Sequence, residues 1–156
     1  MSEFRVEKRR EAAEITLTTG ATVAGHFFLS GSSQLHAGPE RVGELLNLEV
    51  GFFPFGTPDG DTVLINRTCV VKVALPEHVI EAQLDDGYDV ATRRRVELVL
   101  SSGEKITGQV AVYRPPGHDR LYDYAQVAER FRYVEQADRT LLINSLHIVS
   151  LFEVTG

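Results

Sequence analysis

The sequence predicts a mainly β fold made of two tandem, duplicated small barrels, each with five strands and a short helix between its second and third strands. Two internal repeats are the main reason. Most of residues 140–154 already appear as residues 62–75, at an offset of 78, and residues 97–108 repeat residues 14–25 at an offset of 83. In addition, these blocks alternate apolar and polar residues between turns rich in Gly and Pro. A period of about 80 residues exceeds that of solenoid repeats and indicates two small folding units in tandem.

The repeats divide the 156 residues into four expected segments. These are an N-terminal lead-in at 1–12, the first barrel at 13–76, a linker at 77–92 and the second barrel at 93–156. A unit of roughly 70 residues buries only about 60% of its unfolded surface, whereas a body of about 150 residues buries close to 70%. We therefore expect the two halves to pack against each other.

Each half is expected to open with a hairpin. Gly20 in the first half and Gly103 in the second stand between two strand-like runs, where Gly adopts a turn conformation without steric cost. Gly25 and Gly108 lie inside the following strand. An isolated Gly there typically marks a bulge or a sharp bend, which lets a small sheet curl into a barrel.

A short helix is expected to follow each hairpin. In the first half it spans residues 38–46, because Pro39 suits the first helical position and apolar residues recur on one face. In the second half Asp123 is expected to cap the helix, with Gln126 three residues later. Its expected apolar face consists of Tyr124, Val127, Ala128 and Phe131.

Three more strands complete each unit. In the first half they are expected at 50–55, 62–65 and 69–75, and Pro54 would confine the first of these to an edge or a bulge. Asn66 and Asn144 stand where the last two strands meet, and Asn suits a tight bend because it tolerates left-handed backbone and bonds its own main chain. Within the linker, residues 79–84 are compatible with an extra strand.

This pattern resembles the Sm-like small β-barrels, and a bent five-stranded barrel of SH3 type would give a similar pattern. The resemblance lies in residues 17–25 and 100–108, which read apolar-x-x-Gly-x-x-apolar-x-Gly, and in the paired strands that meet at Asn66 and Asn144. It implies that barrels join edge to edge through their fourth and fifth strands, within the chain and between chains. RNA-binding Sm-like proteins carry Asp and Asn after the second strand and Arg-Gly at the bend. This chain has a helix at the first place and Asn66-Arg67 and Asn144-Ser145 at the second, so that RNA site has no counterpart here.

Composition narrows the classes of function. The formal net charge of −6 argues against a general affinity for nucleic acid or anionic lipid. A single cysteine, Cys69, excludes an internal disulfide and suits a reducing compartment. The first residues are charged, without the apolar stretch of a signal peptide or membrane span. We therefore expect a cytoplasmic protein.

The motifs of common catalytic and cofactor sites are missing from the sequence. The five histidines are scattered, without metal-ligand spacing, and neither a nucleophile elbow nor a Gly-rich phosphate loop is present. We expect no cofactor and no metal. Another hypothesis is an enzyme of unfamiliar type with a cleft between the halves, suggested by clustered polar residues at His118, Asp119, Tyr122 and Tyr124.

The favoured function is a non-catalytic structural or protein-interaction module of two fused barrels, with a protein partner or self-association through strand edges. The alternative is a nucleic-acid-binding or nucleotide-binding module, which the acidic charge disfavours. Its candidate ligand or anion contacts are Arg67, Arg93, Arg94 and Arg95. The positions expected to act only as structural turns are Gly20, Gly25, Asn66, Gly103, Gly108 and Asn144.

Overall fold

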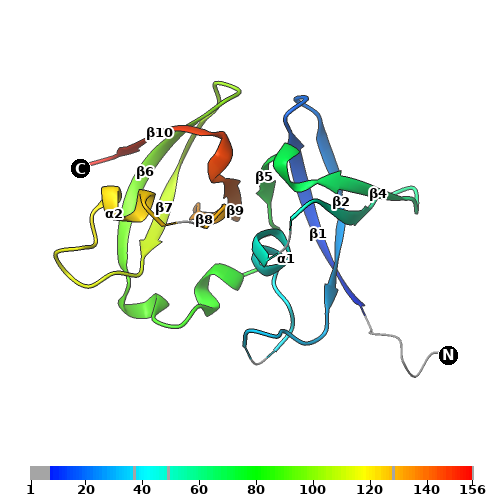
Figure 1. Ribbon diagram of the computed structural model, residues 1–156, viewed down its shortest axis with the longest axis horizontal. Helices are drawn as coiled ribbons and strands as arrows, with labels where there is room; N and C mark the ends of the chain where they lie inside the picture. The colour runs from blue at the N-terminus through cyan, green and yellow to red at the C-terminus, as the bar shows by residue number, and fades with distance from the viewer. Residues whose placement is uncertain (1–7, 37, 49, 128, 156) are drawn as a thin grey trace.

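The structure is a computed structural model that describes residues 8–36, 38–48, 50–127 and 129–155. Over these residues the fold is mainly β, with ten antiparallel strands in one sheet and two short α-helices (Figure 1). The strands of the first half are β1 Lys8–Leu17, β2 Thr22–Ser30, β3 Phe52–Gly56, β4 Thr62–Asn66 and β5 Val70–Ala74. Those of the second half are β6 Thr92–Leu100, β7 Lys105–Val112, β8 Phe131–Glu135, β9 Thr140–Asn144 and β10 Ile148–Glu153. The helices are α1 Val42–Leu48 and α2 Leu121–Ala125.

The sheet order is β10-β6-β7-β8-β9-β5-β1-β2-β3-β4. Each half therefore places its own strands in the order fifth, first, second, third, fourth. The two halves meet where β5 pairs with β9, near the centre of Figure 1. This joint leaves β4 and β10 as the two ends of the sheet.

The strand β1 starts earlier than expected. Residues 8–12 belong to it, whereas residues 1–7 of the expected lead-in lie outside the described residues. In this strand buried and more exposed residues alternate, since Glu11, Ala13 and Ile15 are buried while their neighbours are not. The alternation is hard to recognise in the sequence because many of these residues are charged. A strand with one buried face needs only every second residue to point inward.

Both helices also differ from the expected ones. The helix α1 begins at Val42, three residues after Pro39, because the carboxylate of Glu81 accepts hydrogen bonds from the first free N–H groups, those of Val42 and Gly43, at 3.0 Å each. The helix α2 begins before Asp123, whose carboxylate accepts from the N–H of Arg120 at 3.1 Å. Of its expected apolar face, Ala128 lies outside the described residues and Phe131 begins β8.

The linker holds two 3-10 turns, Glu81–Leu84 and Tyr88–Val90, and the compatible strand at 79–84 is absent. Buried Glu81 and Ala82 fix the first turn against the body of the protein.

The third strand of the first half, β3, is not an edge strand, because it pairs with both β2 and β4. It pairs with β4 throughout but with β2 only at Phe55 and Gly56, so Pro54 lies beyond the end of the β2 ladder.

The hairpin glycines act in two ways. Gly20 and Gly103 have φ of 90° and 89°, the left-handed region that favours glycine. Gly25 and Gly108 show no bulge, since the β1–β2 and β6–β7 registers run through them without a shift. A Cβ on Gly25 would lie 2.0 Å from the carbonyl oxygen of Gly56, so this glycine permits close approach of the next strand.

The two halves share their cores. One cluster is built from the first half, including Ile15 and Phe27, but also contains Phe131 and Leu142 of the second half. The other cluster is built from the second half and contains Val71 of the first. The halves therefore pack together, as the length argument predicts. No helix within the described residues is long and apolar enough to cross a membrane.

Candidate functional site

The joint between the halves is a short antiparallel ladder. Val73 lies opposite Leu142 and Ala74 opposite Leu141, and the N–H of Leu75 donates to the carbonyl of Thr140 at 3.0 Å. Leu142 is fully buried and belongs to the core of the other half. In this ladder the fifth strand of the first half, β5, pairs with the fourth strand of the second half, β9.

Asn144 connects the end of β9 to the start of β5. It is fully buried, its Nδ2 donates to the carbonyl of Val70 at 2.9 Å, and its Oδ1 accepts from the N–H of Leu146 at 3.0 Å. Asn66 makes the equivalent local bond, accepting from the N–H of Thr68 at 3.1 Å. Both have φ near −75°, so the bend does not use the left-handed backbone that the sequence suggested.

Polar contacts reinforce the joint. The side-chain amide of Asn47, in α1, pairs with both the N–H and the carbonyl of Phe131, at 2.7 and 2.9 Å. Lys72 and Glu104 form an ion pair at 2.5 Å across the two halves. These contacts tie α1 and β5 of the first half to β8 and the β6–β7 turn of the second.

The two end strands of the sheet, β4 and β10, correspond in sequence to the strands of the joint, β9 and β5. Leu64, in β4, is the counterpart of Leu142 at the offset of 78, yet it is 69% exposed whereas Leu142 is 0% exposed. Val149, in β10, is the counterpart of Val71 and is 67% exposed against 3%. Phe152 adds a further exposed ring at this end, at 65%. Among the described residues, Leu64 and Val149 are thus apolar and exposed at the ends of the sheet, whereas their counterparts are buried at the joint.

Within the part of the chain that the structure describes, main-chain groups of β10 also point away from the sheet. The N–H of Val154 donates to the carbonyl of Arg95, so the alternating pattern directs the main-chain groups of Leu151 and Glu153 away from β6. The side-chain NH2 group of Asn66 has no acceptor among the described residues, although the same group of Asn144 donates across the joint. Unpaired edges of this kind are templates for pairing with another chain.

Arg67, one of the candidate ligand contacts, is buried and bonds to the main chain of its own half. Its side chain is 2% exposed. The guanidinium donates to the carbonyls of Leu45 at 2.9 Å, Phe52 at 3.0 Å and Val50 at 3.3 Å. It also lies over the ring of Phe53 at 5.4 Å. These bonds hold the end of α1 against β3.

The three consecutive arginines lie in β6 and do not form one surface. Arg93 stacks on the ring of Tyr88 at 4.0 Å. Arg94 points to the other face, where it forms ion pairs with Asp119 and Glu153 at 3.6 and 3.4 Å. Arg95 is exposed. The alternation of a strand separates the neighbours that the sequence placed together.

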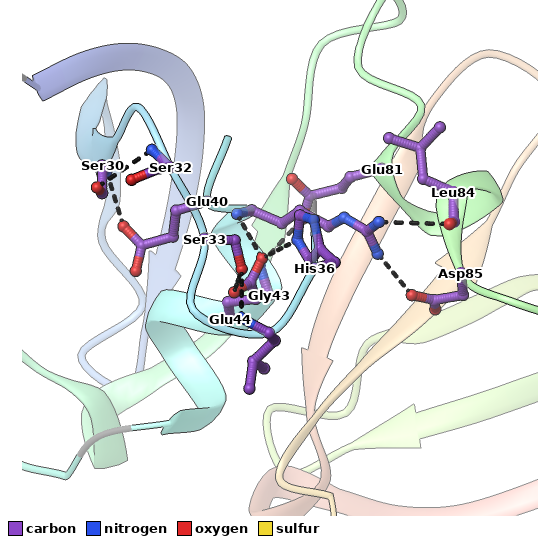
Figure 2. Close-up of polar contacts among 12 residues, drawn as sticks. Ser30, Ser32, Ser33, His36, Glu40, Gly43, Glu44, Glu81, Leu84 and Asp85 are labelled. Carbon is purple, nitrogen blue, oxygen red and sulfur yellow. Dashed lines mark hydrogen bonds and ion pairs between the residues drawn. The ribbon is translucent and has the colours of Figure 1, made fainter. Parts of the chain in front are cut away.

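A polar cluster surrounds the start of α1 (Figure 2). The carboxylate of Glu44 accepts from the hydroxyl of Ser33 at 2.6 Å and contacts the ring of His36. Burial alone would raise the pKa of Glu44, but the bonds from Ser33 and His36 outweigh it and lower this pKa. The carboxylate lies between Ser33 and His36, whereas nucleophile activation needs the imidazole between the hydroxyl and the carboxylate. The cluster therefore orders the loop before α1.

Glu81 is a buried carboxylate next to this cluster (Figure 2). Besides its two helix N–H partners, it accepts from the hydroxyl of Tyr133 at 2.7 Å. Burial is the largest influence on this group and raises the pKa of Glu81 despite these bonds. The linker, α1 and β8 therefore meet at one carboxylate.

The pH dependence of stability should reveal Glu81. Because its pKa is raised on folding, the folded protein binds this proton more tightly, so the stabilisation exists at acidic pH and is lost as the pH rises through the raised pKa. We expect wild type to lose free energy of unfolding relative to Glu81→Gln above the ordinary pKa of Glu. Urea unfolding from about pH 4 to pH 8 measures this difference, and parallel curves would contradict it.

The structure also contains a pocket that sequence reasoning missed. A cavity of about 350 Å³ lies under the linker, and its walls include Tyr88, Tyr113, Tyr124 and Tyr133. Of the residues suggested for an enzymatic cleft, Tyr124 lines this cavity, whereas Tyr122 is 67% exposed and Asp119 bonds the hydroxyl of Thr92 at 2.7 Å. The tyrosines are far apart in the sequence and no motif connects them.

Comparisons with known proteins add no relative: no family model matches the chain, and no curated protein or solved structure is significantly similar to it. Among the described residues, His, Cys, Asp and Glu do not gather in a group of three that could hold a metal ion.

Proposed function

We propose that the chain is a non-catalytic structural module of two fused small barrels that assembles head to tail, with β4 of one copy pairing with β10 of the next. The shared strand order of the two halves supports the two-barrel interpretation, and with it the expected Sm-like or SH3-type resemblance. The observation that carries the assembly is the exposure of Leu64 and Val149, whose counterparts Leu142 and Val71 are buried at the joint.

The joint supplies the register of the proposed contact. Moved by the repeat offset of 78, the pair Val73 and Leu142 becomes Leu151 of one copy opposite Leu64 of the next. Likewise Ala74 and Leu141 become Phe152 opposite Val63. The side-chain NH2 group of Asn66 in one copy would then donate to the carbonyl of Ile148 in the other, as that of Asn144 does to the carbonyl of Val70.

Two different edges meeting make a heterologous contact. Such a contact produces rings when the rotation closes and open filaments when it does not. Burying aliphatic and aromatic side chains on both sides drives it, at about 25 cal/mol per Å² of apolar surface removed from water. The main-chain bonds of the ladder fix its direction and register.

Native mass spectrometry of the purified, untagged chain tests the assembly. We expect wild type at a multiple of the chain mass, and Leu64→Lys and Val149→Lys as monomers, because a charge on an edge strand opposes pairing. Val90→Lys is the matched control, since Val90 is 88% exposed but lies in the linker, and it should assemble like wild type.

Mixing the two edge variants distinguishes the geometry. Leu64→Lys retains an intact β10 and Val149→Lys an intact β4, so head-to-tail pairing predicts that the mixture forms a dimer with one copy of each. Pairing of like edges predicts instead that one variant alone still forms dimers. A wild-type monomer at all concentrations would reject the proposal, and co-purified mass matching a nucleotide or RNA would favour the alternative function.

A further inference from the structure

The tyrosine pocket concentrates aromatic rings and carboxylates in one cavity. Four of the five tyrosines of the chain line it, and so do Asp85, Glu129 and Glu135. Its volume of about 350 Å³ falls in the range of small-molecule sites. Two of the residues that line it, Ala82 and Val112, are apolar and buried.

The charges of the pocket are unevenly neutralised. Asp85 pairs with Arg41 at 2.7 Å, and Glu135 accepts from the hydroxyl of Tyr88 at 2.7 Å. By contrast, Glu129 is exposed, and among the described residues its side chain makes no hydrogen bond or ion pair, although its main-chain carbonyl accepts from Nε of Arg132 at 3.2 Å. Burial is the first cause that raises the pKa of Glu129, while the positive charge of Arg132 acts in the opposite direction.

Two arginines also line the pocket, and the positive charge of Arg132 acts on the nearby carboxylate of Glu129. The guanidinium of Arg132 is buried and donates to main-chain carbonyls, including that of Tyr124 at 2.5 Å. Arg114 is exposed. The pKa of Tyr113 is raised to about 12, by burial first and then by the negative charge of Asp85 and Glu135. At Tyr113 the charges of Asp85 and Glu135 therefore favour a positive charge over a negative one, and Arg93 acts in the opposite direction.

The same rings already bind cations within the molecule. Arg93 lies over Tyr88 at 4.0 Å, and Arg132 lies over Tyr124 at 4.7 Å. Both distances are within the range of a cation–π contact. Tyr113 is 46% exposed and its hydroxyl has no bond among the described residues, so it is open to a ligand.

We propose that this pocket binds an organic monocation, a substituted ammonium or guanidinium group, with the charge between Tyr113 and the carboxylate of Glu129. The source of that cation is either a small free amine or the basic side chain of a peptide. The site and the assembly edges are separate, because the pocket is lined by the linker, the end of β7, the region after α2 and β8.

Titration with a matched pair of ligands tests the proposal. Choline and 3,3-dimethylbutan-1-ol have nearly the same shape, but only choline is charged, and butylguanidinium provides the second cation. The chain has no Trp, so tyrosine fluorescence reports mainly on the pocket, and calorimetry measures the affinity. We expect one of the cations to bind at least about tenfold more tightly than the neutral alcohol.

Variants locate the site. Tyr113→Leu and Glu129→Gln should each weaken cation binding about five- to tenfold. Tyr122→Leu, which changes the one tyrosine outside the pocket lining, should leave it unchanged. Equal affinity for the neutral alcohol, no cation binding up to about 10 mM, or an equal loss in Tyr122→Leu would each overturn the proposal.

Two further measurements ask where the cation comes from and whether its binding depends on assembly. N-acetyl-arginine N-methylamide binding as tightly as butylguanidinium points to a peptide side chain, and much weaker binding points to a free small cation. The titrations use the full chain as wild type and as Leu64→Lys. Cation binding that survives in Leu64→Lys shows that the pocket works independently of assembly, and cation binding that requires assembly contradicts a site within one chain.

Discussion

Leu142→Ala is expected to lower the free energy of unfolding by about 2–5 kcal/mol, because the substitution leaves a cavity in a tightly packed core. Leu142 is fully buried, and it fills the core of the first half although it belongs to the second. The loss should therefore weaken both halves together. Urea unfolding followed by circular dichroism measures it.

The chain provides its own control for this substitution. Leu64→Ala makes the same change at the repeat-related position, which is 69% exposed, and should alter stability by no more than about 0.5 kcal/mol in the single chain. Both variants are compared at the same low protein concentration, because assembly stabilises the folded state by mass action. Equal losses would contradict the difference between the joint and the free edge.

Arg67→Met is expected to cost roughly 3–5 kcal/mol of stability. The substitution retains an unbranched apolar chain but removes the donor that the carbonyls of Leu45, Val50 and Phe52 share. These bonds are partly buried, and an acceptor that loses its partner away from water costs about 1–3 kcal/mol. Because these bonds hold α1, the loop before it should also become more accessible to protease. Thermal and urea unfolding give the size of the effect.

Arg95→Met is the matched control for Arg67→Met. Arg95 is exposed, and its removal should change stability by no more than about 0.5 kcal/mol. If Arg67→Met were as stable as Arg95→Met, the carbonyl contacts of Arg67 would not be structural, and this outcome would favour a ligand role for Arg67. The comparison therefore decides between a structural arginine and a ligand contact.

The strands were predictable because their signals are local. Alternating residues, turn glycines and the spacing of the two repeats are all read along the chain, and the ten strands of the structure lie close to the expected ones. The start of β1 was missed because charged residues occupy its exposed face. The start of α1 was missed because its first N–H groups bond to Glu81, which lies 39 residues beyond Val42.

The arginines show why site residues were harder to predict. Arg67 holds α1 in the first half, and the corresponding task in the second half falls to Arg132, which donates to the carbonyls of Tyr124 and Ala125 in α2. The residue at the offset of 78 from Arg67 is Ser145, so the repeat does not reveal this equivalence. The burial of a side chain depends on which other segments pack over it, so residue type alone does not predict it.

The sequence by itself determined the strand-rich class, the internal repeat, and the turns at Gly20 and Gly103, because these follow from local periodicity and backbone freedom. Only the tertiary structure decided which edges are joined and which stay open, since Leu64 and Leu142 are the same residue type in matching positions with opposite exposure. It also decided that four distant tyrosines face one cavity. Both depend on contacts between segments far apart in the chain, which local patterns do not encode.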